Sequence, residues 1–80
     1  MLSKLKSGKK LVGVKQSGRA IKDGSAACVY VSKDADPMVI RPIEELCTQN
    51  LTPIVFVDTM KELGSACDIA VGAAVAVLVK

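Results

Sequence analysis

Histidine and tryptophan are absent from this 80-residue chain, which contains only one tyrosine, one phenylalanine and three cysteines. Without histidine, neither a Ser-His nor a Cys-His catalytic arrangement can form. Cys28, Cys47 and Cys67 lie about twenty residues apart in apolar surroundings, and no two of them have the spacing of zinc ligands. We expect reduced cysteines in the core, no metal site and no cofactor.

Long hydrophobic runs are also missing. The longest apolar stretch, residues 69–79, has eleven residues, whereas a membrane-spanning helix needs about 20. The first ten residues interleave lysines with two leucines and lack the continuous apolar segment of a signal peptide. Because half of all residues are hydrophobic, the chain is too apolar for disorder. We expect a single small domain over residues 1–80, located in the cytoplasm and away from membranes.

Positive charge is concentrated in the first part of the chain. Residues 1–33 carry eight Lys or Arg against Asp23 alone, a net charge of +7, and the remaining residues carry −4. A positive field on one part of the surface indicates an anionic partner. Lysines that only solubilise a short helix are the alternative explanation.

Hydrophobic periodicity predicts alternating short helices and strands. The expected helices are residues 2–8, residues 14–23, a helix from Pro42 to about Asn50, and a helix capped by Thr59; the expected strands are residues 10–12, 28–32, 54–57 and 73–79. The strands are too apolar to be half exposed, which predicts an α/β fold, a three-layer α-β-α sandwich around a mixed four-stranded sheet. Three loops are candidate ligand sites: residues 13–15, 33–37 and 68–72.

Two patterns that could suggest catalysis have simpler explanations. Residues 13–20 have the glycine spacing of a phosphate-binding P-loop, but Arg19 and Ala20 stand where that motif needs Lys and Ser or Thr. Asp34 and Asp36 could be imagined as an acid/base pair, yet beside a proline they are better explained as turn and cap residues. We therefore predict that the chain is not an enzyme.

The predicted helix over residues 14–23 has a charged surface. Its basic residues follow i, i+4, i+7 spacing and form what we call the basic stripe: Lys15, Arg19 and Lys22. We expect the stripe to lie opposite Val14 and Ile21. Unpaired N–H groups at a helix start attract phosphate oxygens, and Gln16 in the first turn can donate to and accept from a base edge. The pattern predicts nucleic-acid binding, with a solvated basic face as the alternative.

The shortage of aromatic residues narrows the kind of nucleic acid. Only Tyr30 and Phe56 could stack on bases, and both lie in strands that we expect to be buried. Proteins that bind single-stranded RNA use exposed aromatic rings. A lone short helix also argues against reading of the DNA major groove. Structured RNA is therefore favoured.

Three segments together resemble a known family. They are GVKQSGRAIKDG at residues 13–24, KDADP at 33–37 and MKELGSACDIAVGAAVAVL at 60–78. They resemble the kink-turn RNA-binding ribosomal protein family, in particular its bacterial ribosomal-protein-like branch, because Lys15 and Gln16 stand where archaeal and eukaryotic members usually carry Asn-Glu. The resemblance covers nearly the whole chain. It implies an α-β-α sandwich that binds kink-turns, sharply bent RNA elements with tandem sheared G·A pairs.

The resemblance also implies roles for individual residues. Lys15 and Gln16 would read guanines in the widened groove at the G·A pairs, and the loop before the last strand would cover an extruded nucleotide. Ala70 replaces an acid in that loop, and Gly18 replaces the usual Thr or Val. The full set of expected RNA-contacting residues is Gly13, Val14, Lys15, Gln16, Arg19, Lys22, Lys33, Ile69, Ala70, Val71 and Gly72.

We therefore expect a monomeric protein that recognises kink-turns in structured RNA, with the ribosome as a further partner. Two alternatives stay open. The first is a structural subunit of the ribosome or another RNP that acts mainly through protein contacts. The second is a small enzyme that uses the anion site for a nucleotide.

Overall fold

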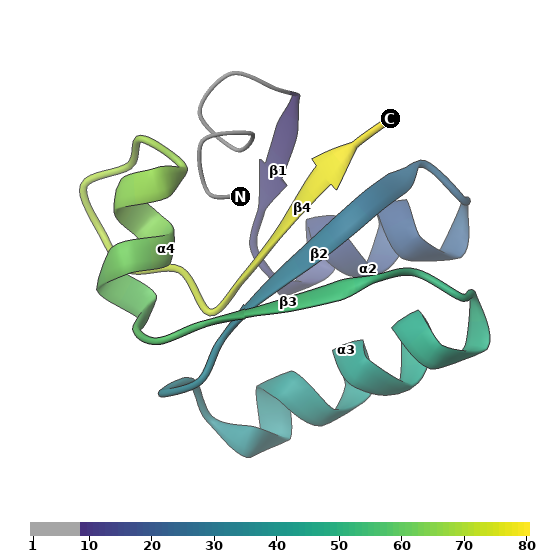
Figure 1. Cartoon of the computed structure of the whole chain (residues 1–80), viewed down its shortest axis with the longest axis horizontal. Coiled ribbons are helices and arrows are strands. Elements are labelled where there is room, and N and C mark those ends of the chain that lie inside the picture. Colours follow the sequence, from purple (N-terminus) through teal and green to yellow (C-terminus); the bar gives the residue numbers. More distant parts are fainter. Residues whose placement is uncertain (1–8) are drawn as a thin grey trace.

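The computed structural model describes residues 9–80, so the helix predicted at residues 2–8 lies outside the described part of the chain. The elements of this part are, in order, β1 (Lys10–Val12), α2 (Val14–Lys22), β2 (Ala26–Ser32), α3 (Pro37–Gln49), β3 (Ile54–Val57), α4 (Met60–Ala66) and β4 (Val75–Val79). Figure 1 shows their arrangement. Helices and strands alternate along the described chain as the periodicity predicts.

The strands form one mixed sheet of four, in the order β1-β4-β2-β3. β2 pairs in parallel with β3, whereas β4 is antiparallel to both β1 and β2. Helices α2 and α3 pack on one face of the sheet and α4 packs on the other. The predicted three-layer α-β-α sandwich with a mixed four-stranded sheet is confirmed.

Two hydrophobic clusters hold the layers together, one on each face of the sheet. Both faces contribute because successive residues of a strand point to opposite sides. Val29 and Val31 of β2 belong to the cluster under α2 and α3, whereas Tyr30 between them belongs to the cluster under α4. In β4, the residues from Val75 to Val77 are all buried. The prediction that both faces of the last strand are covered is confirmed.

The predicted start of the third helix is wrong. α3 begins at Pro37, the preceding Asp36 accepts a hydrogen bond from the Met38 N–H at 2.9 Å, and Pro42 lies inside the helix. Either proline is acceptable at the first position of a helix, and the cap at Asp36 decides which of them starts this one. Pro42 has no N–H for the bond that an interior residue normally makes. The cap role suggested for Asp36 is confirmed.

Helix α4 begins as its sequence predicts. The hydroxyl of Thr59 accepts a hydrogen bond from the Glu62 N–H at 3.1 Å. The apolar residues Met60, Leu63 and Cys67 have the spacing of one helix face, but only Leu63 and Cys67 are buried and Met60 is exposed. Burial raises the pKa of the Cys67 thiol and of the Cys47 thiol. Both thiols are therefore protonated at neutral pH, which agrees with reduced core residues.

Candidate nucleic-acid interface

The three candidate loops converge at one end of the sheet. Backbone hydrogen bonds place them there: Gly13 N–H to the Val75 carbonyl at 2.9 Å, Ser32 N–H to the Ala74 carbonyl at 2.9 Å, and Lys33 N–H to the Val57 carbonyl at 2.8 Å. The start of α2 and the loop over residues 68–72 thus flank the first residues of β4. Residues far apart in the sequence come together at this end, which makes it the candidate site.

Gly13 forms the junction between β1 and α2. Its φ of 109° lies in the region that residues with a side chain rarely adopt. As the N-cap residue it provides no side-chain cap, and the first turn of α2 contains no acidic residue. The free N–H groups and the partial positive charge of the helix start are therefore left for an anion. Lys15 and Gln16, directly after this junction, are exposed.

The basic stripe lies on the outer surface of α2, since all three of its residues are exposed and the inward face is made by Ser17, Ala20 and Ile21. Beside the stripe runs an open groove between α2 and α3. The groove is lined by Val14, Lys15, Gly18, Arg19, Lys22, Pro42, Ile43 and Leu46. The stripe therefore forms the rim of a groove with a mostly apolar floor.

The predicted position of Val14 opposite the stripe is wrong. Ile21 is fully buried as expected, but the Val14 side chain is 40% exposed and lines the same groove as the stripe. Helical spacing does not separate these two residues, because Val14 and Ile21 are seven positions apart and lie within about 20° of each other around the axis. They differ in position along the axis: Val14 is the first residue of α2, whereas Ile21 lies almost two turns further along. Val14 is also next to Lys15 in the sequence, and both line the groove. This places an apolar contact beside the cations at the start of α2.

The loop over residues 68–72 presents apolar side chains to solvent. Val71 is 71% exposed and Ile69 is 36% exposed. Ala70 and Gly72 between and after them are exposed as well. Ile69 and Val71 are therefore not part of the buried core. Contact of this loop with RNA stays a prediction.

Lys33 lies in the loop between β2 and α3 at the same end of the sheet. Its ammonium group is 3.4 Å from a carboxylate oxygen of Asp58, and both side chains are mostly exposed. An exposed ion pair of this kind stabilises a protein by at most about 1 kcal/mol. Lys33 can therefore leave Asp58 for a phosphate at little cost, and its expected RNA contact stays a prediction.

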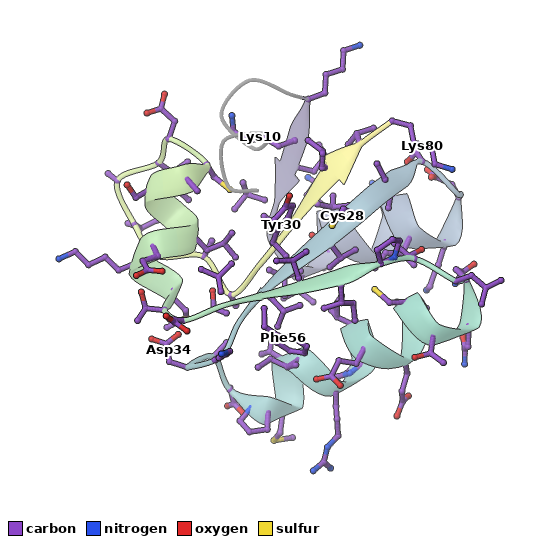
Figure 2. All side chains as sticks on the ribbon, in the orientation of Figure 1. Lys10, Cys28, Tyr30, Asp34, Phe56 and Lys80 are labelled. Atoms are coloured by element: carbon purple, nitrogen blue, oxygen red, sulfur yellow. The ribbon has the colours of Figure 1, made fainter. Side chains whose placement is uncertain are left out.

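The two aromatic residues differ in a way that the sequence did not reveal. Tyr30 is buried as predicted, but Phe56, expected to be buried, is 49% exposed. β3 is an edge strand, so only one neighbouring strand shields its residues. Figure 2 shows Phe56 on the side of β3 that faces α3, away from Tyr30. A single exposed ring does not make the multi-aromatic platform of single-strand binders.

A membrane-spanning helix and a metal-binding group of side chains are two features not found within residues 9–80. In this part of the chain no helix is long and apolar enough to cross a membrane. The same residues contain no group of three or more side chains that could hold a metal ion.

Comparisons with known proteins agree on one family. The chain is 45% identical over 76 residues to an RNA-binding protein of Geobacillus sp., a match that covers 95% of this chain and 93% of the relative. It is 35% identical over 68 residues to the large ribosomal subunit protein eL8 of Halobacterium salinarum, covering 84% of this chain and 57% of that protein. Among solved structures, the 15.5kD RNA binding protein of Giardia lamblia matches with a TM-score of 0.93 and 27% identity, covering 99% of this chain and 70% of that one.

These relatives are RNA-binding and ribosomal proteins, so the prediction of a binding protein and not an enzyme is confirmed. The family-level match extends over residues 1–80. The family resemblance of the three sequence segments is thereby confirmed as well. The chain is an RNA-binding member of the ribosomal protein L7Ae/L30e/S12e/Gadd45 family.

Proposed function

We propose that this protein binds kink-turns in structured RNA through the end of the sheet where α2 begins. The observation that carries the proposal is the meeting of two unlike surfaces there. One is the start of α2, with the exposed Lys15 and Gln16 and the basic stripe. The other is the exposed apolar loop over residues 68–72. Gly13 and the residues entering β4 hold the two surfaces side by side.

This pairing of surfaces suits a bent RNA better than a regular duplex. The major groove of A-form RNA is too deep and narrow for side chains to read. The start of α2 therefore needs a groove that is locally widened, as at tandem sheared G·A pairs. An exposed apolar loop needs a nucleotide that has left the base stack. A kink-turn offers both features within a few nucleotides.

The division of chemistry follows from the geometry of α2. Lys15 and Gln16 in the first turn are close to the free N–H groups and can meet base edges. Lys22 in the last turn lies about 10 Å further along the axis, given a rise of about 1.5 Å per residue, where it meets phosphate. Base contacts then give selectivity, whereas phosphate contacts give salt-dependent affinity.

We further propose that the target RNA belongs to a ribonucleoprotein in the cytoplasm and that the protein binds it as a monomer. One relative is itself a large ribosomal subunit protein, which supports this assignment. The contacts described above come from one chain, so a single copy supplies both surfaces.

The proposal is tested by titrating the protein into two labelled RNAs at equal salt concentration. One RNA carries a kink-turn, and in the other the tandem G·A pairs are replaced by Watson–Crick pairs. One well-formed base contact usually contributes ~1–3 kcal/mol. We expect the replacement to weaken binding by that amount for each base contact that is lost. A plain duplex of equal length gives the non-specific level. Equal affinity for the first two RNAs would refute kink-turn recognition.

A further inference from the structure

The loop over residues 68–72 is held by contacts from several other segments. Its first residue, Asp68, has a φ of 63° and donates its N–H to the Ser65 carbonyl at 3.0 Å. The Ile69 N–H donates to the Gly64 carbonyl at 3.1 Å. Just beyond the loop, the Ala73 N–H donates to the Met60 carbonyl at 3.0 Å. The loop thus runs back along α4, from its last turn to its first (Figure 1).

Gly64, in the middle of α4, permits this close approach. A Cβ atom on Gly64 would collide with the carbonyl oxygen of Val71 and would lie 3.0 Å from its carbonyl carbon and 3.1 Å from the Cα of Gly72. These are backbone atoms, which cannot move aside without moving the loop. Any side chain at position 64 therefore lifts the loop away from α4. The backbone of Val71 lies against α4, whereas 71% of the residue is accessible to solvent. The contact therefore leaves the Val71 side chain exposed.

Ser32, at the end of β2, anchors the residues that directly follow the loop. Its side chain is fully buried, and its hydroxyl donates to the Ala73 carbonyl at 2.6 Å. Its N–H donates to the Ala74 carbonyl at 2.9 Å. Ser32 was not singled out by the sequence analysis, because a serine at the end of an apolar strand has no distinctive pattern. In the structure it joins β2 to the residues that connect the loop with β4.

Asp34 completes the support from the β2–α3 loop. Its carboxylate accepts a hydrogen bond from the Met60 N–H at 2.8 Å, at the first turn of α4. Figure 2 shows Asp34 at the end of the sheet next to this helix. The position of α4, on which the loop rests, is therefore fixed relative to the sheet.

We propose that Gly64 and Ser32 are positioning residues for RNA recognition, which hold the loop over residues 68–72 in the shape that presents Val71 to an unstacked nucleotide. The inference rests on the proposed function, because it assigns the loop to that contact. A loop that is ordered before binding loses little conformational freedom when RNA arrives. Gly64 and Ser32 act through the loop and do not touch the RNA themselves.

The test compares Gly64→Ala, Ser32→Ala and the wild type on two RNAs. One is a kink-turn RNA, and the other is the same RNA with an abasic site at the extruded nucleotide. We expect each substitution to weaken binding of the intact RNA about tenfold and to change binding of the abasic RNA by less than about twofold. The dependence of affinity on salt should match the wild type, because the basic stripe is unaltered. The folded fraction of each variant is measured by circular dichroism, and affinities are calculated from the concentration of folded protein.

Ser65→Ala is the matched control, since Ser65 is the next residue of α4 and its side chain is exposed. It should bind both RNAs like the wild type. Equal losses on the intact and the abasic RNA would show that the substitutions only disturb the fold, and no loss on either RNA would also overturn the inference. If the wild type does not distinguish a kink-turn from its Watson–Crick version, the proposed function fails first, which is a separate result.

A measurement on the free wild-type protein tests the inference without any substitution. NMR relaxation should give backbone order parameters of about 0.85 for residues 69–72, the value of rigid backbone. Values below about 0.6 would mean that the loop is not held before RNA binds. That result would overturn the role of Gly64 and Ser32.

Discussion

The start of α2 and the loop over residues 68–72 lie at the same end of the sheet, yet the chain presents them by different means. The basic stripe is exposed because of its helical spacing, and only Gly13 requires an unusual backbone conformation there. The loop presents Val71 through contacts with α4 and β2, which lie elsewhere in the sequence. Local geometry builds one surface, and tertiary structure builds the other.

This difference has a consequence for RNA binding. The stripe supplies charge, so its contribution falls as salt screens it. The loop supplies apolar area, whose contribution depends little on salt. Charge alone would attract any RNA, whereas the loop and Gln16 require a particular RNA shape. Variants of the two regions should therefore be distinguishable by salt and by RNA structure.

The largest effect is expected for Gln16→Ala. If the Gln16 side chain reads a base edge, its loss should weaken binding of a kink-turn by ~1–3 kcal/mol and binding of a plain duplex by much less. Lys22→Ala, in the last turn of the same helix, is the contrasting variant. It should weaken binding of both RNAs alike and reduce the slope of log affinity against log salt by roughly one.

Titrations of both RNAs at two salt concentrations measure these effects. The two variants share an exposed position on α2, so any general disturbance of the helix should appear in both. If Lys22→Ala discriminated between the RNAs and Gln16→Ala did not, the two roles would be reversed.

A smaller effect is expected for Val71→Ser in the loop. It removes roughly one or two methyl-sized groups from an apolar contact, so RNA binding should weaken by ~1 kcal/mol. The loss should be nearly the same at low and high salt, unlike that of Lys22→Ala. The melting temperature of the free protein should hardly change, because Val71 is 71% exposed. Fluorescence titration and thermal unfolding measure the two quantities.

Leu51→Ser is a matched control for this variant. Leu51 is 90% exposed and lies in the turn between α3 and β3. This turn precedes the first residue of β3, whereas the candidate site lies beyond the last residue of that strand. Replacement of Leu51 should leave RNA affinity unchanged. A large fall in melting temperature of Val71→Ser with intact affinity would place Val71 in the core and leave recognition to α2.

The same contrast explains what the sequence could predict. α2 and the four strands follow from hydrophobic periodicity, which is a local signal. The start of α3 depended on whether Asp36 or Pro42 marks it, and only the hydrogen bond from Met38 to Asp36 decides this. The exposure of Phe56 depends on the position of β3 at the edge of the sheet, which the order of elements does not determine.

For the candidate site, the residues of α2 were identified from spacing and from the family resemblance. The supports of the loop were not. Gly64 looks like an ordinary glycine in a helix, and its importance comes from Val71, seven residues later in the sequence. Ser32 contacts Ala73, which lies forty-one residues away. No local pattern encodes contacts of this kind.

The smallest effect on RNA binding is expected for Gly18→Ala, the counterpart in α2 of Gly64→Ala in α4. Gly18 lies in the middle of α2, and a Cβ atom there would meet only the Cδ1 atom of Leu46, at an ordinary contact distance of 3.8 Å. Glycine in a helix interior is less stable than alanine by up to about 1 kcal/mol. The substitution should therefore stabilise the protein and raise its melting temperature by no more than roughly 4–8 °C, the usual shift for 1 kcal/mol in a domain of this size.

RNA affinity of Gly18→Ala should stay within about twofold of the wild type, because the new methyl group faces Leu46 and leaves the basic stripe unchanged. Thermal unfolding and titration of the kink-turn RNA measure both quantities side by side with Gly64→Ala. A lower melting temperature would mean that Leu46 cannot accommodate the added atom. A large loss of affinity in the stabilised variant would show that RNA enters the groove between α2 and α3, and the interface would then extend further along α2 than the first turn and the stripe.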